Sequence, residues 1–108
     1  MNISQPIEFP CVIKMDQVAE LEYVKNARAF ERALQEQVFT AYDELIDSQL
    51  QCFRFVNNQW QQTGLAPINT LQTWLQHYAA AVGFCCSAKL VSSDASQLIE
   101  LANELADS

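Results

Sequence analysis

Residues 50–64, LQCFRFVNNQWQQTG, contain the clearest local signal in the chain and set its fold class. Aromatic and polar residues alternate on both sides of Asn57-Asn58, as in two strands joined by a turn. Asparagine tolerates the left-handed backbone conformation that a two-residue hairpin loop requires. The sequence therefore predicts a hairpin with one aromatic, buried face and one polar face. The expected pairs are Phe55 with Trp60 and Phe53 with Gln62 on the first face, and Arg54 with Gln61 and Cys52 with Thr63 on the second.

The N-terminal part of the chain predicts a second hairpin. Residues 7–15 alternate between apolar and mixed positions, and residues 19–24 do the same. If each strand has one buried face, an odd loop over residues 16–18 sets Ile13 against Leu21 and keeps both on that face. Pro10 has no N–H to donate, so it fits best on an edge strand or at a bulge.

Helical spacing begins after this hairpin. Asn26 is a suitable N-cap for a first helix, whose expected apolar stripe is Ala27, Phe30, Leu34 and Val38. The remaining predicted elements are a strand over 42–48, a second helix over 69–82 ended by Gly83, a strand over 84–91, and a third helix capped by Ser93 with Leu98, Ile99, Ala102 and Leu105 on its buried side.

These elements predict an α+β protein with a mostly antiparallel sheet and two or three helices packed on one face, in the order ββα-ββ(β)-αβα. A chain of 108 residues, half of them hydrophobic and 18% charged, can bury a core of its own. We therefore expect a single α+β domain over residues 1–108.

The charge balance limits the possible partners. Thirteen acidic residues against six basic ones give a net charge of −7, and lysines and arginines form no cluster. Tight binding to a phosphate backbone needs clustered positive charge, so we expect no nucleic-acid partner. An acidic surface could instead bind a basic protein or a small ligand, although acidity more often serves solubility.

The sequence predicts no membrane partner and a cytoplasmic location. The first residues lack a basic segment followed by an apolar one, and no apolar run approaches the roughly 20 residues that cross a bilayer. In a reducing compartment the four cysteines are expected to be free thiols.

We also expect no metal and no cofactor. A structural zinc site needs four ligands, whereas Cys85 and Cys86 are adjacent and would point to opposite faces of a strand, and His77 is the only histidine. The two glycines of the chain cannot build a phosphate-binding loop or a dinucleotide fingerprint.

The candidates for catalysis are Cys85, as a nucleophile, and His77, as its base. Alternation over 84–91 puts Cys85 on the mixed face with Lys89, but four strand residues span about 13 Å, too far for Lys89 to activate the thiol. His77 would have to be brought near by folding to act as its base. The competing interpretation is an inert thiol, because free cysteine packs as a small hydrophobe.

We therefore expect a non-enzymatic protein that binds a protein partner or itself. The alternatives are a thiol-dependent enzyme centred on Cys85 and an acidic binder of small ligands or basic proteins. An exposed sheet edge is a natural place for such pairing. The candidate binding residues are the polar strand residues Arg54, Gln59 and Gln61 and the acidic residues Glu20 and Glu22.

Three stretches carry a family resemblance: FPCVIKMD at 9–16, DELIDS at 43–48 and GFCCSAK at 83–89. Together they resemble the small gammaproteobacterial domain-of-unknown-function family 4144. The resemblance implies a protein without an assigned activity, so it supplies no catalytic residues. It also leads us to expect a glycine in the first hairpin turn, and none lies between Met15 and Val18.

Overall fold

The structure, a computed structural model, describes residues 6–83 and 92–106. Its five strands form one antiparallel sheet in the order β2-β1-β3-β4-β5. This confirms the predicted α+β class, while the strand predicted over 84–91 lies outside the described residues. In chain order the elements are β1 (Cys11–Lys14), β2 (Leu21–Val24), α1 (Ala27–Glu36), β3 (Glu44–Asp47), β4 (Gln51–Val56), β5 (Gln59–Leu65), α2 (Ile68–Ala81) and α3 (Ala95–Ala106).

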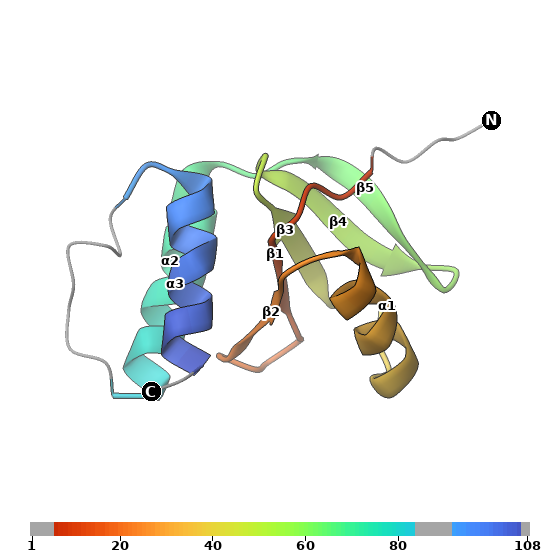
Figure 1. Cartoon of the computed structure of the whole chain (residues 1–108), viewed down its shortest axis with the longest axis horizontal. Coiled ribbons are helices and arrows are strands. Elements are labelled where there is room, and N and C mark those ends of the chain that lie inside the picture. Colours follow the sequence, from red (N-terminus) through yellow and green to blue (C-terminus); the bar gives the residue numbers. More distant parts are fainter. Residues whose placement is uncertain (1–5, 84–91, 107–108) are drawn as a thin grey trace.

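Helices cover both faces of the sheet (Figure 1). Helices α2 and α3 pack side by side on one face, which we call the α2–α3 face, over Val12, Ile46 and Leu21. The other face, the α1 face, carries Phe39 and the partly buried side of α1 over Ile13 and Phe53. Two helices thus share one face as expected, and the first helix lies on the opposite one.

The predicted register of the first hairpin is wrong by one residue. Ile13 pairs with Glu22 and Lys14 with Leu21, where the odd loop had set Ile13 against Leu21. The argument assumed one buried face, but β1 lies between β2 and β3, and both Val12 and Ile13 are fully buried. Leu21 therefore packs on the side of Val12, beneath α2 and α3.

The loop of this first hairpin contains no glycine, yet Gln17 adopts the left-handed conformation (φ 62°) that glycine would adopt freely. Pro10 immediately precedes β1, so the strand enters the sheet interior without needing an N–H from the proline.

The second hairpin forms as predicted. Asn57 and Asn58 both have positive φ (52° and 62°), as the tight two-residue loop requires. The pairs Phe55–Trp60, Arg54–Gln61 and Phe53–Gln62 are all present. Cys52 pairs with Gly64 rather than Thr63, because a register shift between Cys52 and Phe53 inserts one extra residue into β5.

The helix boundaries follow their caps. The Oδ1 of Asn26 accepts a 2.9 Å hydrogen bond from the Ala29 N–H, as expected of an N-cap. Gly83 follows α2 with φ 75°, the left-handed residue that ends many helices. Asp94, not Ser93, caps α3, because its carboxylate reaches the backbone N–H groups of Ser96 and Gln97.

The buried side of α3 agrees with the predicted stripe, whereas that of α1 agrees only in part. Leu98, Ile99, Ala102 and Leu105 of α3 are all buried. In α1 the expected Leu34 is 39% exposed, and Val38, beyond the end of the helix, is 86% exposed. Phe30 does pack toward the sheet as expected, together with Ala29 and Ala33.

Candidate functional site

The two edges of the sheet differ in how well they are protected. At one edge, β2 is only four residues long and its neighbourhood is charged, with Glu20, Glu22 and Lys25. The side chain of Glu22 accepts a hydrogen bond from Gln37, beyond the end of α1, at 3.0 Å. Tyr23 donates one to Glu100 of α3 at 2.6 Å. Short length, charge and flanking helices are the usual ways in which proteins prevent an edge from pairing.

At the other edge, β5 lacks the short length and the charge of β2, and its irregularity is the bulge after Gln62. It is seven residues long, QWQQTGL, and contains neither a charged residue nor a proline. Within the described residues, β4 pairs with one side of β5 and no strand lies on the other. In a two-residue hairpin the pair that flanks the loop, Val56–Gln59, is hydrogen-bonded, so the backbone groups of Trp60 point away from β4. The strand therefore offers main-chain donors and acceptors outward.

The stretch of sequence that contains β4 and β5 is also free of acid. Residues 48–93 contain no aspartate or glutamate, although the chain as a whole carries thirteen acids. Beside β5, Arg54 forms an ion pair with Glu44 at 2.6 Å, with side chains 46% and 29% exposed. Such an exposed pair contributes at most about 1 kcal/mol to stability. Its local effect is to cancel charge, so the surface next to β5 is close to neutral.

A hollow of about 370 Å³ opens at the start of β5, and we call it the Trp60 groove. Its walls come from the segment before β1, from α1 and from the second hairpin. The rings of Phe39 and Phe55 pack edge-on against the Trp60 indole, each with its centroid 5.3 Å away. Trp60 is 8% exposed, and among the described residues its buried indole Nε1 has no hydrogen-bond partner. The residues that line the groove are Pro6, Ile7, Phe30, Leu34, Asn58, Gln59 and Trp60.

Leu65, the last residue of β5, is an exposed apolar side chain on the same face as the groove. It is 73% exposed. It pairs with Gln51, which alternates with Phe53 and Phe55 along β4, so Leu65 projects from the α1 face. The groove and Leu65 thus lie on one face of the sheet at opposite ends of β5.

A buried carboxylate holds the segment that forms one wall of the groove. Asp47 is fully buried and its two oxygens accept four hydrogen bonds, from the N–H groups of Glu8, Gln49 and Gln51 and from the Gln51 side chain, at 2.7–3.0 Å. The same Gln51 amide donates to the Pro6 carbonyl oxygen, and its oxygen accepts from Gln62 of β5. The network ties the N-terminal wall to both strands of the second hairpin. Its role is structural, because every donor comes from the protein itself.

The thiols that the structure describes are not activated. Cys11 is fully buried, and burial together with the nearby charge of Asp47 raises the pKa of its thiol far above the ordinary value. Burial also raises the pKa of the half-buried Cys52. Of the two catalytic candidates, His77 lies on the exposed side of α2, whereas Cys85 lies outside the described residues. Their proximity therefore stays a prediction.

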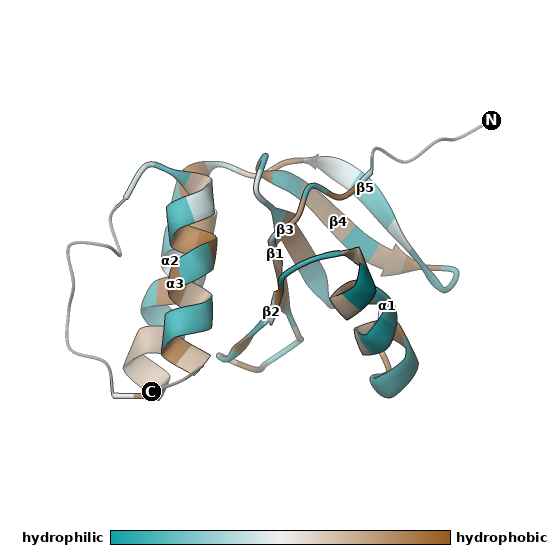
Figure 2. Cartoon of the chain, viewed as in Figure 1, coloured by the Kyte–Doolittle hydropathy of each residue, from teal (hydrophilic) through white to brown (hydrophobic). Residues whose placement is uncertain are grey.

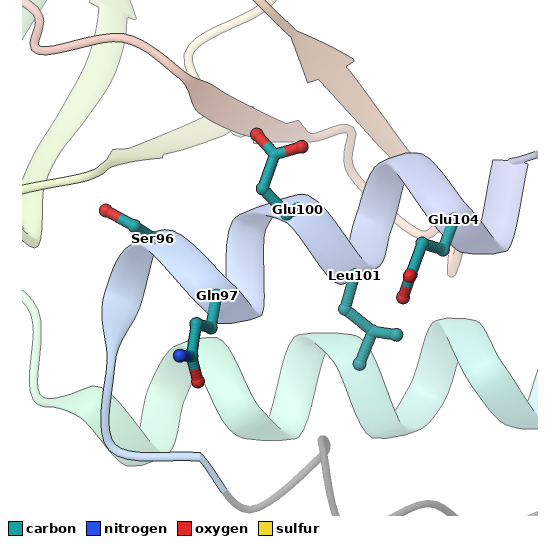
Figure 3. A pocket seen from close by; sticks show the side chains of 5 residues that line it. All are labelled: Ser96, Gln97, Glu100, Leu101 and Glu104. Carbon is teal, nitrogen blue, oxygen red and sulfur yellow. The ribbon is translucent and has the colours of Figure 1, made fainter.

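A second hollow, of about 430 Å³, runs along α3 and is lined by Ser96, Gln97, Glu100, Leu101 and Glu104 (Figure 3). Glu100 points toward the strands, where it accepts the hydrogen bond from Tyr23, while Leu101 points toward α2. Burial and this hydrogen bond raise the pKa of Tyr23 to about 12. The carboxylate of Glu100 therefore joins β2 to α3, and the hollow has a structural explanation.

Within residues 6–83 and 92–106, no three histidine, cysteine or acidic side chains gather closely enough to hold a metal ion. None of the helices in that part of the chain combines the length and apolar character needed to cross a bilayer.

The structure brings some of the predicted binding residues together and separates others. Arg54, Gln59 and Gln61 lie on β4 and β5, where Arg54 and Gln61 form a cross-strand pair. Glu20 and Glu22 lie at the opposite edge, in and beside β2. Sequence reasoning missed the groove and Leu65, since Trp60 was assigned to the core alone. The absence of acid over 48–93 was a signal that pointed to this edge.

Comparisons with known proteins agree with the fold and assign no activity. The pattern of a family described as "protein structure with unknown function" matches residues 9–102. A solved structure, described as "NMR structure of the protein from Shewanella Amazonensis", matches 95% of this chain and 94% of its own, with a TM-score of 0.80 and 21% sequence identity. At that identity the likeness concerns the fold alone. A search of curated proteins finds no match.

Proposed function

The chain belongs to the DUF4144 family, whose description names no activity, and from the geometry we propose that it is a non-catalytic module that binds an extended protein strand at β5. The observation that carries this proposal is the open, uncharged and proline-free edge strand. Strand addition to a sheet edge obtains affinity from main-chain hydrogen bonds and specificity from pockets for alternate side chains. β5 offers both, because the Trp60 groove opens beside it.

The contrast between the two edges supports this assignment. The β2 edge is protected by charge and by helix contacts, whereas β5 is longer, uncharged and free of proline, and its bulge lies only after Gln62. In Figure 2 most of β5 is teal to white, so the edge is polar rather than an apolar surface prone to non-specific association. Gln59 and Gln61 supply side-chain amides beside that edge. Selective pairing with one strand is the function that fits such an edge.

The proposal includes a protein partner or a second copy of the chain rather than nucleic acid, a membrane or a metal, and a cytoplasmic location. The free thiols of Cys11 and Cys52 agree with a reducing compartment. The net charge of −7 argues against a phosphate backbone as the ligand.

A peptide that copies residues 59–65, Gln-Trp-Gln-Gln-Thr-Gly-Leu, provides the test. Titrated into isotope-labelled protein, it should shift the NMR amide signals of β5 and of the groove residues Ile7 and Leu34. The control is the same peptide with alternate amides N-methylated, which keeps the side chains but cannot donate to an edge. Equal shifts with both peptides, or no shift with either at concentrations where the chain is a monomer, would contradict strand addition.

The enzyme alternative, a thiol-dependent activity centred on Cys85 with His77, is tested separately. We expect native protein treated with an aromatic disulfide reagent to show no thiol that reacts faster than an ordinary free cysteine. A single fast thiol that maps to Cys85 and slows in the His77→Ala variant would contradict the non-catalytic proposal.

A further inference from the structure

We propose that the strand received by β5 is the β5 of a second copy of this chain, so that two sheets join and each Leu65 enters the Trp60 groove of the other copy. This inference rests on the proposed function, because it names the occupant of the edge. It is built on three features already described: the open edge, the groove and the exposed leucine.

The positions of Leu65 and the groove suit a two-fold axis. Leu65 is the last residue of β5 and Trp60 the second, five residues apart, which corresponds to about 17 Å of extended strand. Antiparallel pairing about an axis through the middle of β5 reverses the strand direction, so the Leu65 end of one copy lies beside the Trp60 end of the other. An axis perpendicular to the sheet keeps the α1 faces of both copies on the same side. Each leucine then meets the face that holds the groove.

The chemistry of the two surfaces is complementary. Leu65 is 73% exposed, so most of its apolar side chain can still be buried by a partner. The groove presents Ile7, Phe30, Leu34 and the Trp60 indole, and Leu34 is itself 39% exposed. Insertion of the leucine removes apolar surface of both copies from water, twice in one symmetric interface.

The distribution of charge favours a second copy over a basic protein. Two copies with a net charge of −7 repel each other wherever their acids meet. β5 carries no charge, the sequence from 48 to 93 that includes both strands of its hairpin contains no acid, and Arg54 neutralises the nearby Glu44, so this edge is where like-charged copies can approach. A basic partner would instead be attracted to the acidic residues at the β2 edge, such as Glu20 and Glu22.

Sedimentation of the full chain over about a hundredfold range of concentration tests the proposal. We expect the mass to rise from 12.2 kDa toward twice that value. Leu65→Ser should raise the dissociation constant of the dimer at least about tenfold, because both copies lose apolar burial. Gln61→Lys should weaken it as well, because it places one lysine from each copy close to the axis and next to Arg54.

Two matched controls make the same chemical changes elsewhere. Val18→Ser removes a 44%-exposed aliphatic side chain from the loop before β2, and Gln76→Lys adds a lysine to the exposed side of α2. Both should dimerise like the parent chain. Unfolding in urea verifies that each variant is folded.

The outcomes separate this inference from the proposed function. A parent chain that stays at 12.2 kDa throughout, or β5 variants that dimerise as tightly as the controls, would overturn the second copy as occupant. If the 59–65 peptide still shifts the β5 amides in that case, the edge accepts a strand and the proposed function stands. If the peptide and the sedimentation experiment both give negative results, both proposals fall.

Discussion

The buried carboxylate of Asp47 gives the sharpest test of how the N-terminal segment is held. In an Asp47→Asn variant one carboxylate oxygen becomes an amide NH₂, which faces two N–H donors instead of accepting from them. On the Oδ2 side these donors are the Glu8 N–H and the Gln51 side chain, at 2.9 and 2.7 Å. A buried donor left without an acceptor costs about 1–3 kcal/mol, so two of them cost roughly 2–6 kcal/mol.

We expect a loss of about 3–4 kcal/mol in the free energy of unfolding, because Gln51 can turn its amide and recover part of the cost. A small domain is stable by about 5–15 kcal/mol, so the variant should still fold. Urea unfolding, followed by the fluorescence of Trp60 and Trp74, measures this loss. The dependence of the free energy of unfolding on urea concentration should be unchanged.

The control for this experiment is Asp16→Asn. It makes the same chemical change at an exposed side chain, and only the backbone N–H of Asp16 binds Asp43. We expect it to alter stability by less than about 0.5 kcal/mol. If Asp47→Asn costs less than about 1 kcal/mol, or no more than the control, the hydrogen-bonded carboxylate does not hold this region together and the reasoning fails.

Three other predictions follow from single features. The thiol of Cys11, whose pKa burial raises, should react with a thiol reagent only after unfolding, and rapid labelling in the native protein would contradict its burial. Tyr23 has its pKa raised from about 10 to about 12, so between these pH values the unfolded chain loses the phenolic proton while the folded chain keeps it. The free energy of unfolding should therefore fall as pH rises from about 10 to about 12, and in the Tyr23→Phe variant it should fall less steeply. Urea unfolding at several pH values measures both, and an equal dependence on pH in the two chains would disprove the raised pKa. Gln17→Gly removes a left-handed conformation that costs a residue with a side chain about 1 kcal/mol, but it also makes the unfolded chain more flexible. We therefore expect the free energy of unfolding to rise by about 0.5 kcal/mol. A decrease in the same assay would argue against this turn geometry.

Local pattern predicted the second hairpin well because its determinants are adjacent in sequence. Asn57 and Asn58 supply the backbone conformation, and the loop length then sets the pairs from Phe55–Trp60 to Phe53–Gln62. The same holds for the Asn26 cap, whose partner lies three residues away. Alternation could not reveal the extra residue in β5 that makes Cys52 pair with Gly64. The residues around this bulge are polar or glycine, so the bulge does not interrupt any apolar pattern.

The first hairpin shows where this reasoning ends. The alternation over residues 7–15 is real, since Cys11 and Ile13 share one face, but the parity argument assumed that a strand has one buried face. β1 became an interior strand because β3, more than thirty residues along the chain, pairs with its second side. Because both faces of the sheet are covered by helices, the apolar residues of β2 can be buried on either face. Leu21 packs with Val12 beneath α2 and α3.

The candidate site shows the same division. The sequence by itself determined the elements, the polar residues Arg54, Gln59 and Gln61, and the charge distribution, because these depend on composition and on neighbours within a few residues. Only the tertiary structure decided that β5 is the outer strand, that Glu20 and Glu22 lie at the opposite edge, and that Trp60 forms a groove with Ile7 and Leu34. Strand order and concave surfaces arise when segments distant in the chain pack against one another, and periodicity carries no information about which segments will meet.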